Sequence, residues 1–102
     1  MKLVYVAGPY RSSTEEGLYQ NIQTAREYAK KLWQAGYAVI CPHSNTAFMG
    51  GVMPDEVFLD GTLEMLKRCD HIFMLPRWNE SSGARAEKEY ADAHGITEVF
   101  LD

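Results

Sequence analysis

The stretch Lys2-Leu-Val-Tyr-Val-Ala7, closed at once by Gly8-Pro9, decides how this chain folds. Its β-branched and aromatic residues predict a strand, and Gly-Pro ends that strand in a turn. Three further strands are predicted over residues 37–41, 70–75 and 96–101. The run over 70–75 is mostly apolar, which is typical of parallel strands that are covered on both faces.

Helical patterns fill the intervals between these strands. The first helix is predicted to begin at Ser12 or Ser13, because each stands three residues before a glutamate in a capping-box pattern, and to end before Gly36. A second helix is predicted over 55–68 and a third over 82–95. The first helix has an apolar stripe at helical spacing, formed by Leu18, Ile22, Ala25, Ala29 and Leu32.

Strands that alternate with helices imply a parallel sheet joined by right-handed crossovers. We therefore expect one domain, residues 1–102, with an α/β fold of three layers, Rossmann-like or flavodoxin-like, around a parallel sheet of four or five strands. Ligands of such sheets bind beyond the carboxyl ends of the strands, near the point where the strand order reverses. The loops predicted at that edge are 7–13, 42–54 and 76–83.

The overall charge and hydropathy exclude several classes of partner. The chain is 46% apolar, has a formal charge of −4 and contains no run of Lys or Arg, so we expect no nucleic acid polymer as a partner. Its apolar runs are far shorter than the ~20 residues that cross a bilayer, and we expect a cytoplasmic protein with no membrane partner. A domain of 102 residues buries a modest share of its surface, so we expect a homodimer or a higher homo-oligomer.

Two Cys-x-His pairs, Cys41-Pro-His43 and Cys69-Asp-His71, bear on metal binding. Four such ligands are enough for zinc, but zinc sites usually use wider spacings. Two separate buried thiols are the simpler interpretation, and we expect neither a metal nor a disulfide.

The third helix carries a carboxylate, Glu87, on or beside its inward face. Burying a bare charge is unfavourable, so a buried carboxylate here needs hydrogen-bond donors or a cavity. The alternative is a glutamate near the first turn that simply interacts favourably with the helix dipole. The preceding Ser81-Ser82-Gly83 forms either a plain helix cap or, because Gly83 has no side chain, an open anion site at the helix N-terminus.

The loop Gly8-Pro9-Tyr10-Arg11 is the more specific feature. Gly8 permits close approach, Pro9 stiffens the turn, and Arg11 supplies a cation suited to phosphate or carboxylate. The loop matches neither a Walker sequence nor the dinucleotide fingerprint. Tyr5 lies near the end of its strand, where its hydroxyl either reaches the site or ends at the rim of the core.

Three more side chains are candidates for the ligand site because of their positions in the sequence. His43 follows a strand end and either contacts a ligand or packs at the rim of the core. Trp78 lies in the loop over 76–83 and is a candidate to stack on a planar ligand, whereas Trp33 is expected in the core. Asp60, on the second helix, is a candidate to line the site.

Five motifs are spread over the chain: Tyr5-Val-Ala-Gly8-Pro9-Tyr10-Arg11, Asn21-Ile-Gln-Thr-Ala25, Cys41-Pro42-His43, Cys69-Asp70 and Ser81-Ser-Gly83-Ala-Arg-Ala-Glu87. Together they resemble the nucleoside 2-deoxyribosyltransferase-like family, and within it a branch of small domains, the DUF4406 type. The resemblance covers essentially the whole chain. Its most specific parts are the Tyr-x-x-Gly-x-x-Arg and Ser-x-Gly-x-x-x-Glu spacings.

The resemblance implies that Glu87 is a nucleophile, oriented by Tyr5, that attacks the anomeric carbon of a nucleoside or nucleotide. It implies that the glycine loop with Arg11, together with Ser81 and Gly83, binds the sugar or the 5′-phosphate. No metal or redox cofactor is expected. Members of the family cleave with water or transfer the sugar to another base, and they form dimers or larger oligomers in which a neighbouring subunit often completes the pocket.

One position departs from the family pattern. The better characterised members carry an aspartate eight residues before the position of Asp70, where this chain has Thr62, and Asp60 is the candidate replacement. The hypothesis is therefore a nucleoside or nucleotide N-glycosidase or 2-deoxyribosyltransferase, with Glu87 as the nucleophile and Asp60 as the acid that serves the leaving base. The alternative is a module that binds a nucleotide or nucleotide sugar without turning it over.

Overall fold

The structure is a computed structural model of the 102-residue chain that describes residues 1–45, 49 and 51–102. Its centre is an all-parallel sheet of four strands in the order β2-β1-β3-β4. The strands are β1 (Leu3–Ala7), β2 (Ala38–Ile40), β3 (His71–Met74) and β4 (Thr97–Glu98). The order matches that of the flavodoxin-like folds, so the predicted fold class is confirmed.

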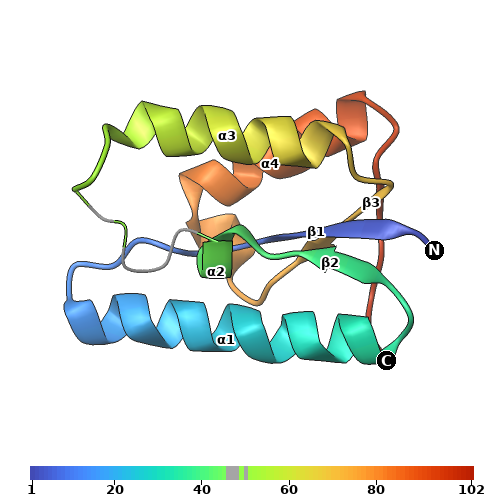
Figure 1. The fold of residues 1–102 in the computed structure, drawn as a ribbon, viewed down its shortest axis with the longest axis horizontal. Helices are drawn as coiled ribbons and strands as arrows, with labels where there is room; N and C mark the ends of the chain where they lie inside the picture. The colour runs from blue at the N-terminus through green and yellow to red at the C-terminus, as the bar shows by residue number, and fades with distance from the viewer. Residues whose placement is uncertain (46–48, 50) are drawn as a thin grey trace.

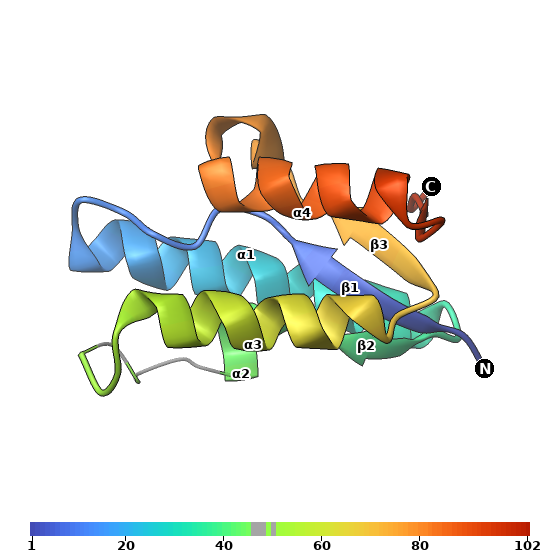
Figure 2. The same cartoon turned by 90° about the horizontal axis from the view of Figure 1, so that it is seen from above.

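Helices cover both faces of this sheet (Figures 1 and 2). One face is covered by α1 (Glu15–Gln34), and the other by α3 (Asp55–Lys67) and α4 (Ser82–Ala93). Two short elements complete the fold, namely α2 (Pro42–Asn45) and the 3-10 turn η1 (Trp78–Glu80). Among the described residues no helix combines the length and the apolar character that crossing a membrane requires.

The sheet divides the core into two clusters because successive side chains of a strand point to opposite faces. Along β1, Val4 and Val6 pack toward α1, whereas Tyr5 and Ala7 pack toward α3 and α4. We refer to these as the α1 cluster and the α3/α4 cluster. Figure 2 shows β1 between α3 and α4, so a side chain on that face of β1 lies under the gap between the two helices.

Two sequence expectations about α1 are wrong in detail. The N-cap is Thr14, whose hydroxyl accepts a hydrogen bond from Gly17 N at 2.9 Å, and not Ser12 or Ser13. Three consecutive hydroxyl residues offered the same kind of cap, so spacing alone did not select among them. Trp33 is 54% exposed and not in the core, because it lies in the last turn of α1 beside the short edge strand β2.

Further differences concern loops and strand ends. The predicted loop over 43–54 begins within α2, and β2, β3 and β4 are shorter than predicted. Gly36 follows the end of α1 with φ +99, as expected of a glycine that ends a helix. These differences leave the order of the long helices and strands as predicted.

The order of the strands reverses between β1 and β3. The segments that follow these two strands leave the sheet there in different directions. Leu75 N donates to Ala7 O at 2.8 Å, and Gly8 follows beside Leu75. A Cβ on Gly8 would lie 2.5 Å from Leu75 Cβ. Gly8 is therefore required by the neighbouring strand end, which adds a structural reason to the close ligand approach expected from the sequence.

We expect Gly8→Ala to lower the free energy of unfolding by about 1–3 kcal/mol, the usual cost of overpacking. The measurement is urea unfolding. Gly61→Ala is the matched control, because a Cβ at Gly61 meets no heavy atom within 4 Å and the helix interior favours Ala by up to about 1 kcal/mol. Equal effects of the two substitutions would contradict the close contact between Gly8 and Leu75.

Candidate functional site

A tyrosine and a glutamate from distant parts of the chain form a hydrogen-bonded pair under α3 and α4. Tyr5 on β1 is 1% exposed, and its hydroxyl donates to Glu87 Oε2 on α4. Glu87 itself is half-buried, two turns into the helix. Among the described residues, Glu87 Oε1 has no hydrogen-bond partner, so one carboxylate oxygen is fixed and the other is left for a ligand.

The environment of the pair determines where the proton resides. Burial raises the pKa of Glu87, and the hydrogen bond from Tyr5 opposes that rise. Burial, the charge of Glu87 and the hydrogen bond to it raise the pKa of Tyr5. Tyr5 therefore keeps its proton and acts as the donor, and Glu87 accepts that hydrogen bond while remaining partly exposed to water.

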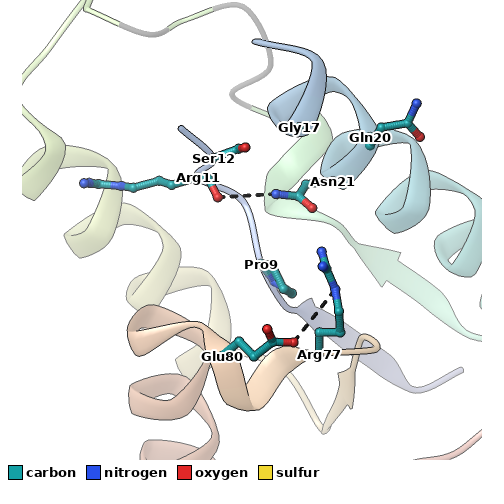
Figure 3. A pocket seen from close by; sticks show the side chains of 8 residues that line it. All are labelled: Pro9, Arg11, Ser12, Gly17, Gln20, Asn21, Arg77 and Glu80. Atoms are coloured by element: carbon teal, nitrogen blue, oxygen red, sulfur yellow. Dashed lines mark hydrogen bonds and ion pairs between the residues drawn. The ribbon is translucent and has the colours of Figure 1, made fainter. Parts of the chain in front are cut away.

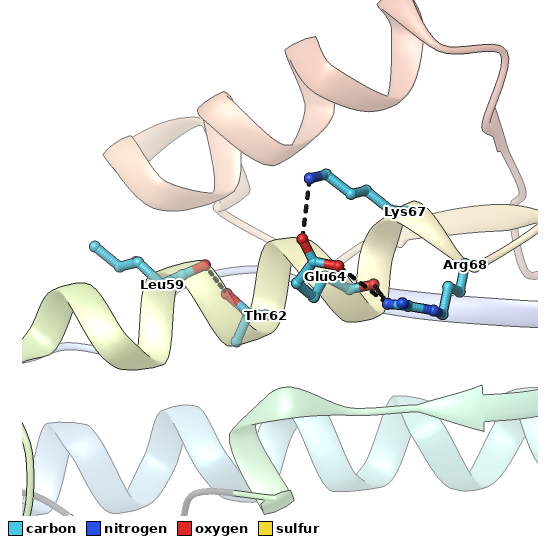
Figure 4. Close-up of polar contacts among 5 residues, drawn as sticks. All are labelled: Leu59, Thr62, Glu64, Lys67 and Arg68. Carbon is cyan, nitrogen blue, oxygen red and sulfur yellow. Dashed lines mark hydrogen bonds and ion pairs between the residues drawn. The ribbon is translucent and has the colours of Figure 1, made fainter.

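Thr62 is the third member of this group. Its hydroxyl interacts with the Tyr5 phenol and opposes the rise of the pKa of Tyr5. The same hydroxyl donates to Leu59 O, one turn earlier in α3, at 3.0 Å (Figure 4). Thr62, the position at which the resemblance described above implies an aspartate, thus lies next to the Tyr5 hydroxyl.

Asp60 lies elsewhere on the same helix. A helix turns about 100° per residue, so Asp60 is about 200° around α3 from Thr62. It is exposed, and no contact joins it to Tyr5 or Glu87 within the described part of the chain. The role of acid for Asp60 remains a prediction, and this placement does not support it.

The residues before Glu87 build the start of α4. Ser81 is the N-cap, and its hydroxyl accepts a hydrogen bond from Ala84 N at 3.2 Å. Ser82 and Gly83 are exposed, and a Cβ on Gly83 would meet only Ser81 Oγ, at 4.0 Å. The cap therefore accounts for Ser81, whereas packing does not require a glycine at position 83.

A pocket of about 460 Å³ opens at the carboxyl edge of β1 and β3, against the first turns of α1 (Figure 3). Arg77 points into the space between the loop after β1 and α1, and Glu80 lies beside it at 4.0 Å. Asn21 Nδ2 donates to Tyr10 O at 3.0 Å, which fixes the loop against α1. The lining residues are Pro9, Arg11, Ser12, Gly17, Gln20, Asn21, Arg77 and Glu80.

Arg11 belongs to this pocket and reaches toward α3, where it pairs with Asp55 at 2.7 Å. Both side chains are 68% exposed. An exposed ion pair contributes about 0–1 kcal/mol, so a ligand anion competes with Asp55 for the guanidinium at little cost. Arg11 is thus available to an anion bound at this edge.

The pocket and the Tyr5–Glu87 pair lie on opposite sides of the segment 7–11. The pocket is on the side of α1, and the pair is in the α3/α4 cluster. Sequence reasoning found the two loops that carry the pocket but missed six of its lining residues, namely Ser12, Gly17, Gln20, Asn21, Arg77 and Glu80. For Arg77 and Glu80 the sequence offered a signal, because both fall inside the loop 76–83 that was predicted at the ligand edge.

His43 supports the loop after β1 from inside the protein. It is 5% exposed, and its Nε2 lies 2.8 Å from Pro9 O. Burial lowers the pKa of His43, which favours the neutral imidazole as donor to that carbonyl. The Tyr10 ring packs edge-to-face on His43 with ring centroids 5.5 Å apart. Its position indicates a residue that shapes the loop, with little surface left for a ligand.

Trp78 and the two cysteines are also placed by the fold. Trp78 is half-buried and packs against the α3/α4 cluster. Cys41 belongs to the α1 cluster and Cys69 to the α3/α4 cluster, so the sheet separates the two Cys-x-His pairs and they do not form one zinc site. Within the described residues, no three His, Cys, Asp or Glu side chains are grouped to hold a metal ion.

Comparison with known proteins gives one family. A family model described as a domain of unknown function (DUF4406) matches residues 2–100. No curated protein matches the chain.

We expect Tyr5→Phe to raise the pKa of Glu87 further, because the substitution removes the hydrogen bond that lowers it. Titration of the Glu87 side-chain carboxyl carbon by NMR measures this directly. Tyr28→Phe is the control, since Tyr28 packs on Phe73 on the other face of the sheet. An unchanged Glu87 titration in Tyr5→Phe would mean that the hydrogen bond is absent in solution.

We expect Glu87→Gln to become more stable relative to the unchanged protein as the pH rises above 4.5, the ordinary pKa of the group. A raised pKa in the folded state means that the native protein binds more protons in this window, so its stability falls as the pH rises through it. Urea unfolding at pH 3 and at pH 7 gives the difference. Glu89→Gln, exposed on the same helix, should show no such pH dependence.

Proposed function

We propose that this chain, which belongs to the DUF4406 family, cleaves the N-glycosidic bond of a nucleoside or nucleotide by nucleophilic attack of Glu87. The observation that carries the proposal is the hydrogen bond from the buried Tyr5 hydroxyl to Glu87 Oε2, which leaves Oε1 free. Tyr5 is the central residue of β1, and its side chain lies under α3 and α4, two residues before the carboxyl end of the strand, the edge at which ligands of such folds bind.

The chemistry follows from the charge that develops at the anomeric carbon. Cleavage of the C1′–N bond passes through an oxocarbenium-like state, which a nearby carboxylate stabilises or traps as a glycosyl ester. In the proposed reaction Oε1 forms the bond to C1′ as the bond to the base breaks. Water or a second base then attacks C1′ and releases Glu87, while Tyr5 holds the carboxylate in one orientation.

The pocket against α1 suits the 5′-phosphate of a nucleotide, whereas the sugar has to lie against Glu87 Oε1 for C1′ to be attacked. Arg11 and Arg77 supply cations there, and the first turn of α1 presents backbone N–H groups. The pocket is open to solvent, so we expect a second copy of the chain to enclose the bound ligand, in a homodimer or a larger homo-oligomer. No metal or redox cofactor enters this reaction.

The proposal is tested by incubating the protein with nucleosides, deoxynucleosides and their 5′-monophosphates, with and without an acceptor base, and following the free base by chromatography. Glu87→Gln should lower the rate of release about 10³-fold or more, the scale expected for loss of a nucleophile. Glu89→Gln is the matched control and should retain full activity, since it is exposed on the same helix.

Two outcomes would count against the proposal. Release that survives in Glu87→Gln would remove Glu87 as the nucleophile. Thermal stabilisation by nucleotides without release of base from any of them would favour a binding module, because a ligand bound only by the folded state raises stability.

A further inference from the structure

Glu87 is the only carboxylate that faces Tyr5 in the described part of the chain. On α3, Asp55 pairs with Arg11, and Glu64 pairs with Lys67 and Arg68 (Figure 4). Glu56 and Asp60 on the same helix are exposed. The α3 side of the site therefore presents Thr62 where an acid would be needed.

The carboxylates outside α3 do not change this result. Asp70 accepts from Leu3 N and Glu98 pairs with Lys88, while Asp102 is exposed. The acidic residues of α1, which covers the other face of the sheet, are Glu15, Glu16 and Glu27.

On α4, Asp92 pairs with Lys88, and Glu89 is exposed. Glu80 lies in the pocket on the α1 side, next to Arg77. Residues 46–48 and 50, which the structure does not describe, are Thr, Ala, Phe and Gly and carry no carboxyl group.

The proton donors next to Tyr5 are already engaged. The Tyr5 hydroxyl donates to Glu87 Oε2, and the Thr62 hydroxyl donates to Leu59 O. The Cys69 thiol donates to Met65 O at 3.3 Å, and burial raises its pKa to about 11. Within one copy of the chain, the described residues thus give Glu87 no partner that delivers a proton to a departing base.

We propose that the substrates of this site are nucleosides or nucleotides whose base is cationic, attached through a quaternised ring system such as a pyridinium or an N7-alkylated purine. This inference rests on the proposed function. A neutral base departs as an anion unless an acid protonates it, whereas a cationic base departs neutral and needs no acid.

The reaction balances with the groups that the site holds. The electron pair of the C1′–N bond passes to the ring and cancels its positive charge, while Glu87 Oε1 forms an ester with C1′. Water then attacks C1′, the ester bond breaks, and the carboxylate is restored. One proton from that water is released to solvent, and the products are the free sugar, the neutral base and H⁺.

The charge distribution favours such a ligand. The Glu87 carboxyl group lies beside Tyr5 under α3 and α4, while Arg77 lines the pocket against α1 and Arg11 reaches from that pocket toward Asp55 on α3. A nucleotide with a cationic base carries its two charges at opposite ends, with the phosphate suited to the arginines and the ring suited to the carboxylate.

The experiment compares 7-methylguanosine with guanosine, which differ by one methyl group and one positive charge, and nicotinamide mononucleotide with cytidine monophosphate. We expect kcat/KM to be higher for the cationic member of each pair by about 100-fold or more, the contribution that an acid makes where one is present. The pH profile with nicotinamide mononucleotide should rise as Glu87 ionises and show no fall on the basic side before the protein unfolds.

Substitutions at two positions sharpen the comparison. Thr62→Asp places a carboxyl group beside Tyr5 and should raise kcat/KM for guanosine at least about tenfold, whereas Thr62→Asn, of the same size, should not. Glu80→Gln should leave the preference for cationic bases unchanged. If Glu80→Gln selectively abolishes cleavage of neutral nucleosides, Glu80 supplies the proton and the inference is overturned.

The outcomes separate this inference from the proposed function. Cleavage of neutral and cationic members at comparable rates, both lost in Glu87→Gln, would overturn the inference and leave the N-glycosidase in place. Absence of cleavage for every compound would overturn both.

Discussion

The hydrogen bond between Tyr5 and Glu87 is the interaction on which the candidate site depends. It joins the first strand to the last long helix, 82 residues apart in sequence, and lies within the α3/α4 cluster. A carboxylate at such a depth is unfavourable unless a donor satisfies it, and a phenol at such a depth needs an acceptor. Each group therefore accounts for the burial of the other, and the pair fixes one carboxylate oxygen without neutralising its charge.

The parallel sheet is what brings these two residues together. β1 and β3 are central and adjacent, and the crossover through α3 and the helix α4 lie on the same face, so a side chain of β1 meets both helices. Gly8 then lies directly against Leu75, whose N–H donates to Ala7 O, so the ends of β1 and β3 stay together where the strand order reverses. The pocket against α1 lies at this edge and is lined by Pro9 and Arg11 after β1 and by Arg77 and Glu80 after β3.

The element order, the parallel sheet and the ligand edge could be predicted because strand and helix patterns are local and the handedness of crossovers is nearly fixed. The face of α3 that points toward the sheet could not be predicted. Val57 and Leu59 are apolar yet exposed, so the apolar residues of this helix mark no single face, and the sequence did not reveal whether Thr62 or Asp60 points inward. The role of His43 could not be predicted from the sequence either. Its position at a strand end suited a ligand contact, but in the structure its ring is hydrogen-bonded to Pro9 O and supports the loop after β1.

The positions of the charged groups around the segment 7–11 bear on the charge of the ligand that the proposed site would bind. The Glu87 carboxyl group is half-buried and hydrogen-bonded to the Tyr5 phenol. Arg11 and Arg77 are exposed, and a ligand anion can replace the exposed carboxylates that they pair with, Asp55 on α3 and Glu80. A ligand that spans the segment experiences a negative field at one end and a positive field at the other. In the proposed reaction Thr62 supplies no acid to the departing base, so the charge of the base itself is the property on which we expect both binding and bond cleavage to depend.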